Sequence, residues 1–169
     1  MTQHARPLNN SQVAILEYLA DFKCLTKSQM ARLGVRKNAS DLYRAIAPIR
    51  DIKKPLISRV VMGALAPYGK LEDVYFLTRH GVEFFIENHL KLSDQIRYPK
   101  SKFSLFHKDY KHRIATINFH IELHIWLKGI EGEINIASSY FDKPGSQRRG
   151  EPLIINKIEI TEKITLFLI

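Results

Sequence analysis

The stretch that decides the fold reads "LTKSQMARLGVRKNASDLYRAI" (residues 25–46). It contains two short amphipathic runs, separated by a glycine and a group of cationic side chains. In the first run, Thr26 and Gln29 have the spacing of a capping box, in which each side chain bonds the backbone amide of the other residue. Gly34 suits the left-handed position that ends a helix. The first run is therefore predicted to be a short helix followed by a tight turn.

The second run predicts a helix that begins at Asn38 or Ser40, where "NASD" is another possible capping box. Pro48 is expected to end or kink this helix near Ala47, because proline lacks a backbone donor. Four apolar residues recur at helical spacing and should face inward: Leu42, Ala45, Ile46 and Ile49.

Further elements are predicted on both sides of these runs. A helix over residues 11–22, with Ser11 as its N-cap, should precede them. Apolar and β-branched residues predict strands at 56–62 and 74–77, joined by a long, exposed, Gly- and Pro-rich tip. Another helix should run from Thr78 to about Leu90. The predicted inner faces are Val13, Leu16, Leu19 and Ala20 in the first helix and Val82, Phe85, Ile86 and His89 in the last.

The C-terminal part has a different character. Residues 91–106 are polar, basic and interrupted by Pro99, which predicts a linker. A helix of about twenty residues should cover 107–127, and residues 133–169 should form short strands around a loop. Apolar residues cover more than one side of this helix: Ile114, Ile117, Ile121 and Ile125 lie on one face, and Phe119, Leu123 and Trp126 lie elsewhere. Two interpretations therefore stay open: the helix packs against the chain's own strands, or it pairs with a second copy of the chain.

Charge is concentrated in the N-terminal part. The chain of 169 residues carries a formal charge of +9, and residues 23–59 alone hold 10 Lys and Arg against 2 Asp and Glu. Residues 114–169 hold 6 against 7. A concentrated basic segment attracts polyanions, of which nucleic acid is the usual one, although a solvated basic face is the alternative. No run is apolar enough to span a membrane, and one cysteine cannot form an internal disulfide, so the cytoplasm is the expected compartment.

Three helices followed by a hairpin are the order of a winged helix-turn-helix. The expected fold class is α+β, with this DNA-binding domain over residues 8–90, a basic linker over 91–106, and a long helix with short strands over 107–169. A recognition helix enters the major groove of double-stranded DNA and needs donors on its outer face. The residues predicted to contact DNA lie on the turn, the third helix and the wing: Arg36, Lys37, Asn38, Ser40, Tyr43, Arg44, Arg59, Tyr68 and Lys70.

Three motifs, "LTKSQMARL" (25–33), "YFLTRHG" (75–81) and "HRIATINF" (112–119), resemble the replication-relaxation family of plasmids and other mobile elements. The resemblance covers about residues 8–128. It implies DNA binding in plasmid replication, relaxation or transfer control, with replication or relaxase proteins as possible partners. The C-terminal region departs from the family, whose members often continue into a nuclease-like region. Here Glu159, Glu162 and Lys163 have the wrong spacing for a metal-dependent nuclease, so no catalytic residue and no enzyme activity is expected.

For the other candidate residues, a structural role is favoured over a functional site. His120 and His124 lie four residues apart, but "HIELH" lacks the glutamate of a zinc-protease helix, so a helix interface is preferred and no metal is expected. Cys24 lies among apolar residues and should be a buried thiol. The sequence has no phosphate-binding glycine loop, and no cofactor is expected. Two further functions remain open: a chromosomal transcriptional regulator of the same fold, and an adaptor whose basic face binds an acidic protein.

Overall fold

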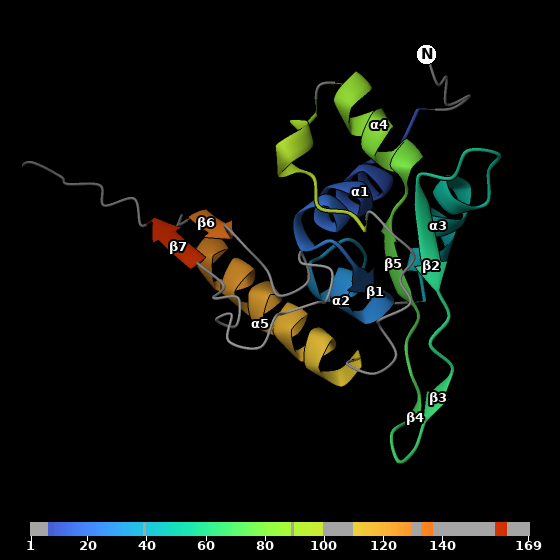
Figure 1. The fold of residues 1–169 in the computed structure, drawn as a ribbon, viewed down its shortest axis with the longest axis vertical. Coiled ribbons are helices and arrows are strands. Elements are labelled where there is room, and N and C mark those ends of the chain that lie inside the picture. Colours follow the sequence, from blue (N-terminus) through green and yellow to red (C-terminus); the bar gives the residue numbers. More distant parts are fainter. Residues whose placement is uncertain are drawn as a thin grey trace, which may run out of the picture. The chain divides into compact units, whose positions relative to one another are not determined.

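The computed structural model describes residues 7–38, 40–88, 90–99, 110–129, 133–136 and 158–161. These residues form helices and small antiparallel sheets, which confirms the α+β class (Figure 1). Residues 1–118 form one compact unit and residues 119–169 a second. The elements are α1 (Asn10–Phe22), β1 (Leu25–Thr26), α2 (Lys27–Arg32), α3 (Leu42–Arg50), β2 (Ile57–Val60), β3 (Ala64–Leu65), β4 (Gly69–Lys70), β5 (Val74–Leu77), α4 (Arg79–Glu87), a 3-10 turn η1 (Ser93–Gln95), α5 (Tyr110–Gly129), β6 (Glu133–Ile136) and β7 (Ile158–Thr161).

A three-stranded antiparallel sheet with the order β1-β5-β2 organises the first unit. The central strand β5 pairs with β2 from Ile57 opposite Leu77 to Val60 opposite Val74. The two-residue strand β1, which the sequence did not predict, pairs Leu25 with Tyr75. Beyond the sheet the hairpin continues into β3 and β4, which project away from the helices (Figure 1). The predicted hairpin with a long, exposed tip is therefore confirmed.

The first helix starts earlier than predicted, since its N-cap is Asn9 and not Ser11. The Asn9 side chain accepts from the backbone amide of Gln12 at 3.0 Å, and the Gln12 side chain accepts from the amide of Asn9 at 3.0 Å. Ser11 cannot form such a box, because the residue three positions on is Ala14. The buried face is correspondingly shifted: Val13 is half-buried, and the buried residues are Gln12, Ile15, Leu16, Leu19 and Ala20.

The helix α2 begins as predicted. The Thr26 hydroxyl accepts from the amide of Gln29 at 3.3 Å, and the Gln29 side chain accepts from the amide of Thr26 at 2.9 Å. Gly34 follows the helix with φ +82°, a conformation that glycine adopts at little cost. Both sequence predictions for this segment are confirmed.

The helix α3 begins later than predicted, at Leu42. Asn38 instead organises the preceding turn, since its side-chain oxygen accepts from the Asp41 amide at 3.3 Å and from the Ser40 hydroxyl at 3.0 Å. Pro48 was predicted to end or kink the helix near Ala47; it does not end the helix, because α3 continues to Arg50. Proline removes one helical hydrogen bond, but its side chain is exposed, and burial of the apolar stripe favours a continuous helix. All four residues of that stripe are buried as predicted: Leu42, Ala45, Ile46 and Ile49.

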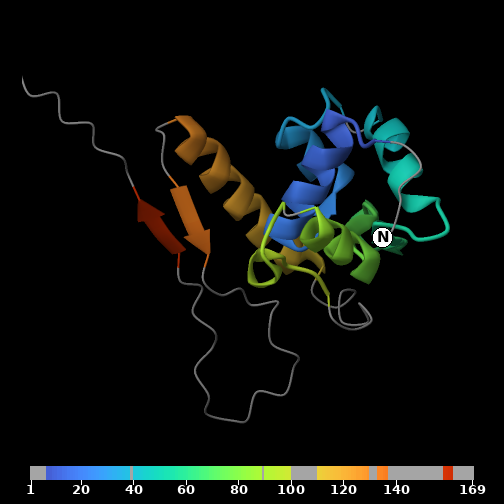
Figure 2. The ribbon, with the colours of Figure 1, turned by 90° about the horizontal axis from the view of Figure 1, so that it is seen from above.

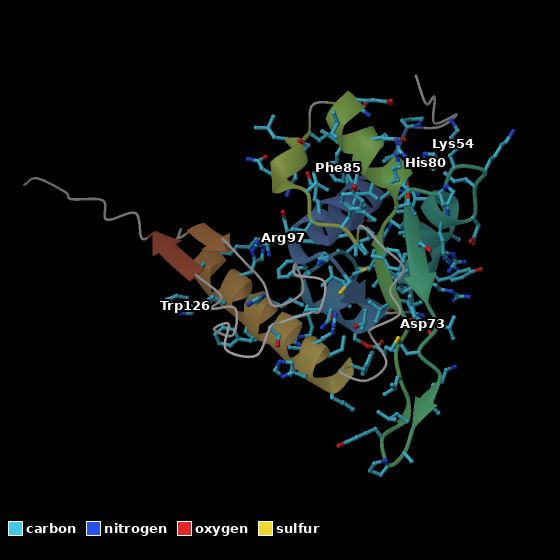
Figure 3. All side chains as sticks on the ribbon, in the orientation of Figure 1. Lys54, Asp73, His80, Phe85, Arg97 and Trp126 are labelled. Atoms are coloured by element: carbon cyan, nitrogen blue, oxygen red, sulfur yellow. The ribbon has the colours of Figure 1, made fainter. Side chains whose placement is uncertain are left out.

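The helix α4 has Thr78 as its N-cap, and this hydroxyl accepts from the amide of Gly81 at 3.1 Å. Phe85 is fully buried and lies between α4 and α1 (Figure 3). Val82 is also buried, but Ile86 is 44% exposed, so its predicted inward position is wrong. The helix ends at Glu87, and the predicted inner residue His89 lies outside the described residues. In Figures 1 and 2, α4 lies on the far side of α1 from α2.

The start of the segment predicted as a linker contacts α1. The Arg97 amide donates to the Ala20 carbonyl at 2.8 Å, and Ile96 is buried. Lys91 forms an ion pair with Asp21. Residues 91–99 are thus fastened to the first unit, whereas residues 100–106 lie outside the described part of the chain.

The long helix α5 matches the prediction within a few residues, although 107–109 are not described. It belongs to both units, because the division falls between Asn118 and Phe119. Ile117 and Ile121 are buried, as a core face requires, but Ile125 is exposed. In the second unit β6 pairs with β7, from Glu133 opposite Thr161 to Ile136 opposite Ile158. The predicted loop between these strands lies outside the described residues.

Gly81 provides a test of the packing between α4 and Leu56, the residue before β2. A Cβ at this position would collide with the backbone carbonyl of Leu56, whereas a Cβ at Gly129 would meet nothing within 4 Å. We expect Gly81→Ala to lower the free energy of unfolding by about 1–3 kcal/mol, because backbone cannot yield as a flexible side chain does. Gly129→Ala, the matched control, should leave stability unchanged or raise it by up to about 1 kcal/mol. Chemical denaturation of both variants measures the difference, and equal stabilities would contradict this packing.

Candidate nucleic-acid interface

The outer face of α3 is polar and cationic. Tyr43 is 57% exposed, and Ser40 and Arg44 are exposed as well. Ala47 completes this face as a half-buried residue. The buried stripe on the opposite side orients these side chains towards solvent. The structure thus places Ser40, Tyr43 and Arg44 where a polar ligand can reach them.

One cation of α3 is already neutralised. Arg50 donates to the two carboxylate oxygens of Asp51 from Nε and a terminal nitrogen, both at 2.6 Å. These bonds lower the pKa of Asp51 and raise the pKa of Arg50. The Arg50 guanidinium also lies 6.0 Å from the ring centre of Tyr43. Arg50 is therefore committed to the protein, and Arg44 is the unpaired arginine of this helix among the described contacts.

The turn between α2 and α3 is anchored by its backbone and by one apolar side chain. The Gly34 amide donates to the Ala31 carbonyl at 2.9 Å, and the Val35 amide donates to the Met30 carbonyl at 3.2 Å. Val35 is buried. The three predicted site residues that follow it, Arg36, Lys37 and Asn38, are exposed. The anchored turn holds two adjacent cations beside the start of α3.

The hairpin carries the remaining predicted residues. Tyr68 and Lys70 are exposed at its tip. Arg59, on β2, lies 3.3 Å from a carboxylate oxygen of Asp73, which Figure 3 shows near the base of the hairpin. The charge of Arg59 is therefore partly compensated. The hairpin tip has no such carboxylate partner for Lys70 within the described residues.

The first half of α5 contacts both α2 and the hairpin, which the sequence did not predict. The Tyr110 hydroxyl donates to the Glu72 carbonyl at 3.2 Å. The side-chain oxygen of Asn118 accepts from Gln29 at 2.9 Å and from Arg32 at 3.2 Å. Lys111 places its ammonium 4.0 Å from the ring centre of Tyr68. Residues 110–118 thus belong to the same unit as the candidate interface.

Cys24 has no role at this surface. It is buried, and burial raises the pKa of its thiol to about 12. A thiol with this pKa stays protonated near neutral pH and is a poor nucleophile. The expectation of a buried thiol is confirmed.

The described residues give no support for a metal site or for a membrane-spanning helix. Among the described residues there is no group of three or more histidine, cysteine or acidic side chains that could hold a metal ion. Over the same ranges, no helix combines the length and the apolar character that crossing a membrane requires. Comparison of the whole chain with protein-family models, curated proteins and solved structures gives no match.

Proposed function

We propose that residues 8–90 form a winged helix-turn-helix that binds double-stranded DNA. The order of α1, β1, α2, α3 and the β2–β5 hairpin supports this assignment, as does the sheet order β1-β5-β2. The observation that carries the proposal is the exposure of Arg36, Lys37 and Arg44 around the start of α3, without ion-pair partners in the described structure. A duplex is a dense polyanion, and such cations are the groups that bind it.

The proposed roles follow from position. The helix α3 would enter the major groove, about 12 Å wide, with Arg44 reaching base edges and Tyr43 and Ser40 beside it. Arg36 and Lys37 would contact phosphates at the edge of the groove, with Asn38 holding the turn. Tyr68 and Lys70 would contact the backbone from the wing. Arg59 would contribute less than an unpaired arginine, because Asp73 partly compensates its charge.

The resemblance to the replication-relaxation family supports a role in plasmid or mobile-element replication, relaxation or transfer control. A chromosomal transcriptional regulator would use the same surface, and mapping the bound DNA sites separates these two. An adaptor that binds an acidic protein is the alternative from another class. A gel shift with random duplex DNA tests it, because an adaptor would leave the duplex unbound.

The salt dependence of binding tests the proposed function. If about five to seven phosphates are neutralised, log K against log salt should fall with a slope of roughly −5 to −6. Fluorescence anisotropy with a labelled duplex, over salt concentrations of about 50 to 300 mM, gives this slope. A slope shallower than about −2 would exclude the basic surface as the DNA-binding face.

The two parts of the interface should respond differently to substitution. Arg44→Ala should cost about 1–3 kcal/mol on the preferred site and relax specificity, because it removes a base contact. Lys70→Ala should weaken binding to all sequences alike. Arg79→Ala is the matched control, because Arg79 is exposed on α4 and paired with Glu83 at 2.9 Å. The measurement is the affinity of each variant for a preferred and for a scrambled duplex. Equal weakening of both by Arg44→Ala would contradict the assignment of Arg44 to a base contact.

We also propose that the protein forms a homodimer through α5, within the predicted 107–127 region. Phe119 is 60% exposed and Trp126 is 55% exposed, and Trp126 projects from α5 in Figure 3. Because these two residues are two helical turns apart, they lie on one face of the helix. Large exposed aromatic side chains are typical of interfaces between subunits. Ile117 and Ile121 cannot form this contact, because both are buried within the chain.

The dimer is tested with surface and core substitutions in the same helix. Phe119→Asp with Trp126→Asp should give a folded monomer, because both side chains are exposed. Ile121→Asp should instead unfold its unit, since it buries a charge without a partner. Light scattering and circular dichroism distinguish these outcomes. Wild-type protein that stays monomeric at tens of micromolar, free and on DNA, would contradict the proposal.

A further inference from the structure

The wing is poorly charged for a surface that meets phosphate. Residues 61–70 contain one cationic residue, Lys70, and no acidic residue. The nearest cation on the adjoining strand, Arg59, is paired with Asp73. Each phosphate contact contributes one neutralised charge to the salt dependence of binding. The wing alone therefore offers one uncompensated charge.

A second cation reaches the wing from outside the winged-helix segment. Lys111 lies in the first turn of α5, and its ammonium is 4.0 Å from the ring centre of Tyr68. This distance is that of a cation–π contact, which favours a defined position for the lysine without neutralising its charge. Figure 1 shows the start of α5 beside the hairpin.

The first turn of α5 is also fixed to the base of the wing. Tyr110 is buried, and its hydroxyl donates to the Glu72 carbonyl at 3.2 Å. Neither acidic side chain at this base is paired with Lys111 in the described contacts: Asp73 pairs with Arg59, and Glu72 accepts from the neutral Ser28 hydroxyl at 2.7 Å. Lys111 is exposed and has no carboxylate partner among the described residues. Its charge thus remains available to an anion in solution.

We propose that Lys111 contacts the DNA backbone together with Tyr68 and Lys70, so that the DNA-binding surface includes the first turn of α5. This inference rests on the proposed function. Phosphates recur along one DNA strand at about 3.4 Å of helix rise. A DNA strand that touches Tyr68 therefore brings a phosphate within reach of Lys111, whose ammonium lies over the same ring. The wing and α5 then form one contact with two cations. Tyr68 positions the second cation as well as touching the backbone.

The test compares lysines at the two ends of the same helix. Lys111→Met removes the charge and keeps the length, and Lys128→Met makes the same change at the far end of α5. Because it removes one phosphate neutralisation, Lys111→Met should make the salt slope shallower by about 0.9 and weaken binding roughly fivefold at physiological salt, equally on all sequences. Lys128→Met should match the wild type, and Lys111→Arg should restore the slope.

A second substitution tests the role of the ring. Tyr68→Ala should weaken binding, and adding Lys111→Met to it should cost less than Lys111→Met costs alone, because the lysine no longer has the ring beside it. The unfolding temperature of each variant shows whether the fold is intact. A Lys111→Met protein that folds and keeps the wild-type slope, while Lys70→Met makes it shallower, overturns this inference and leaves the proposed function standing. A wild-type slope shallower than about −2 overturns both.

Discussion

The buried amide of Gln29 is the contact on which the first unit depends. Its oxygen accepts from the Thr26 amide at 2.9 Å, which starts α2 at the end of β1. Its nitrogen donates to Asn118 at 2.9 Å, which fastens α5 to α2. A buried amide is costly unless donor and acceptor are both satisfied, and these two bonds satisfy both. One side chain therefore joins a strand end, a helix start and the long helix.

The geometry around α3 is set by apolar burial. The stripe that contains Leu42 and Ile46 fixes the rotation of the helix, and the buried Val35 fixes the turn before it. Apolar burial of this kind tolerates no rotation, because a turn of the helix would expose several large side chains at once. The outer face is thus determined by the inner one. Arg44 is exposed for the same reason that Ile46 is buried.

Local rules predicted several parts of the chain in which each residue's partner lies within four positions, although they missed the Asn9–Gln12 capping box and the start of α3 at Leu42. The capping box at Thr26, the stripe of α3 and the left-handed Gly34 are all of this kind. The strand β1 was not predicted, because two residues have no readable period and only pairing with β5 makes them a strand. Pro48 does not end α3, because the local cost of proline is outweighed by tertiary burial. The candidate site shows the same division: exposure of the predicted contact residues follows from helical spacing and turn composition, but the state of their charges does not. Arg59 meets Asp73 across 14 positions, and such a pair depends on how the hairpin folds back, which periodicity does not encode.

The cations of the first unit differ in whether they have a carboxylate partner. Arg79, Lys91 and Arg50 each pair with a carboxylate on or beside their own element or on α1. In contrast, the cations of the turn, the start of α3 and the hairpin tip have no carboxylate partner among the described residues. Solubility requires net charge but no particular placement. Uncompensated cations gathered around one exposed helix instead create a local positive potential, and the proposed DNA binding rests on that potential.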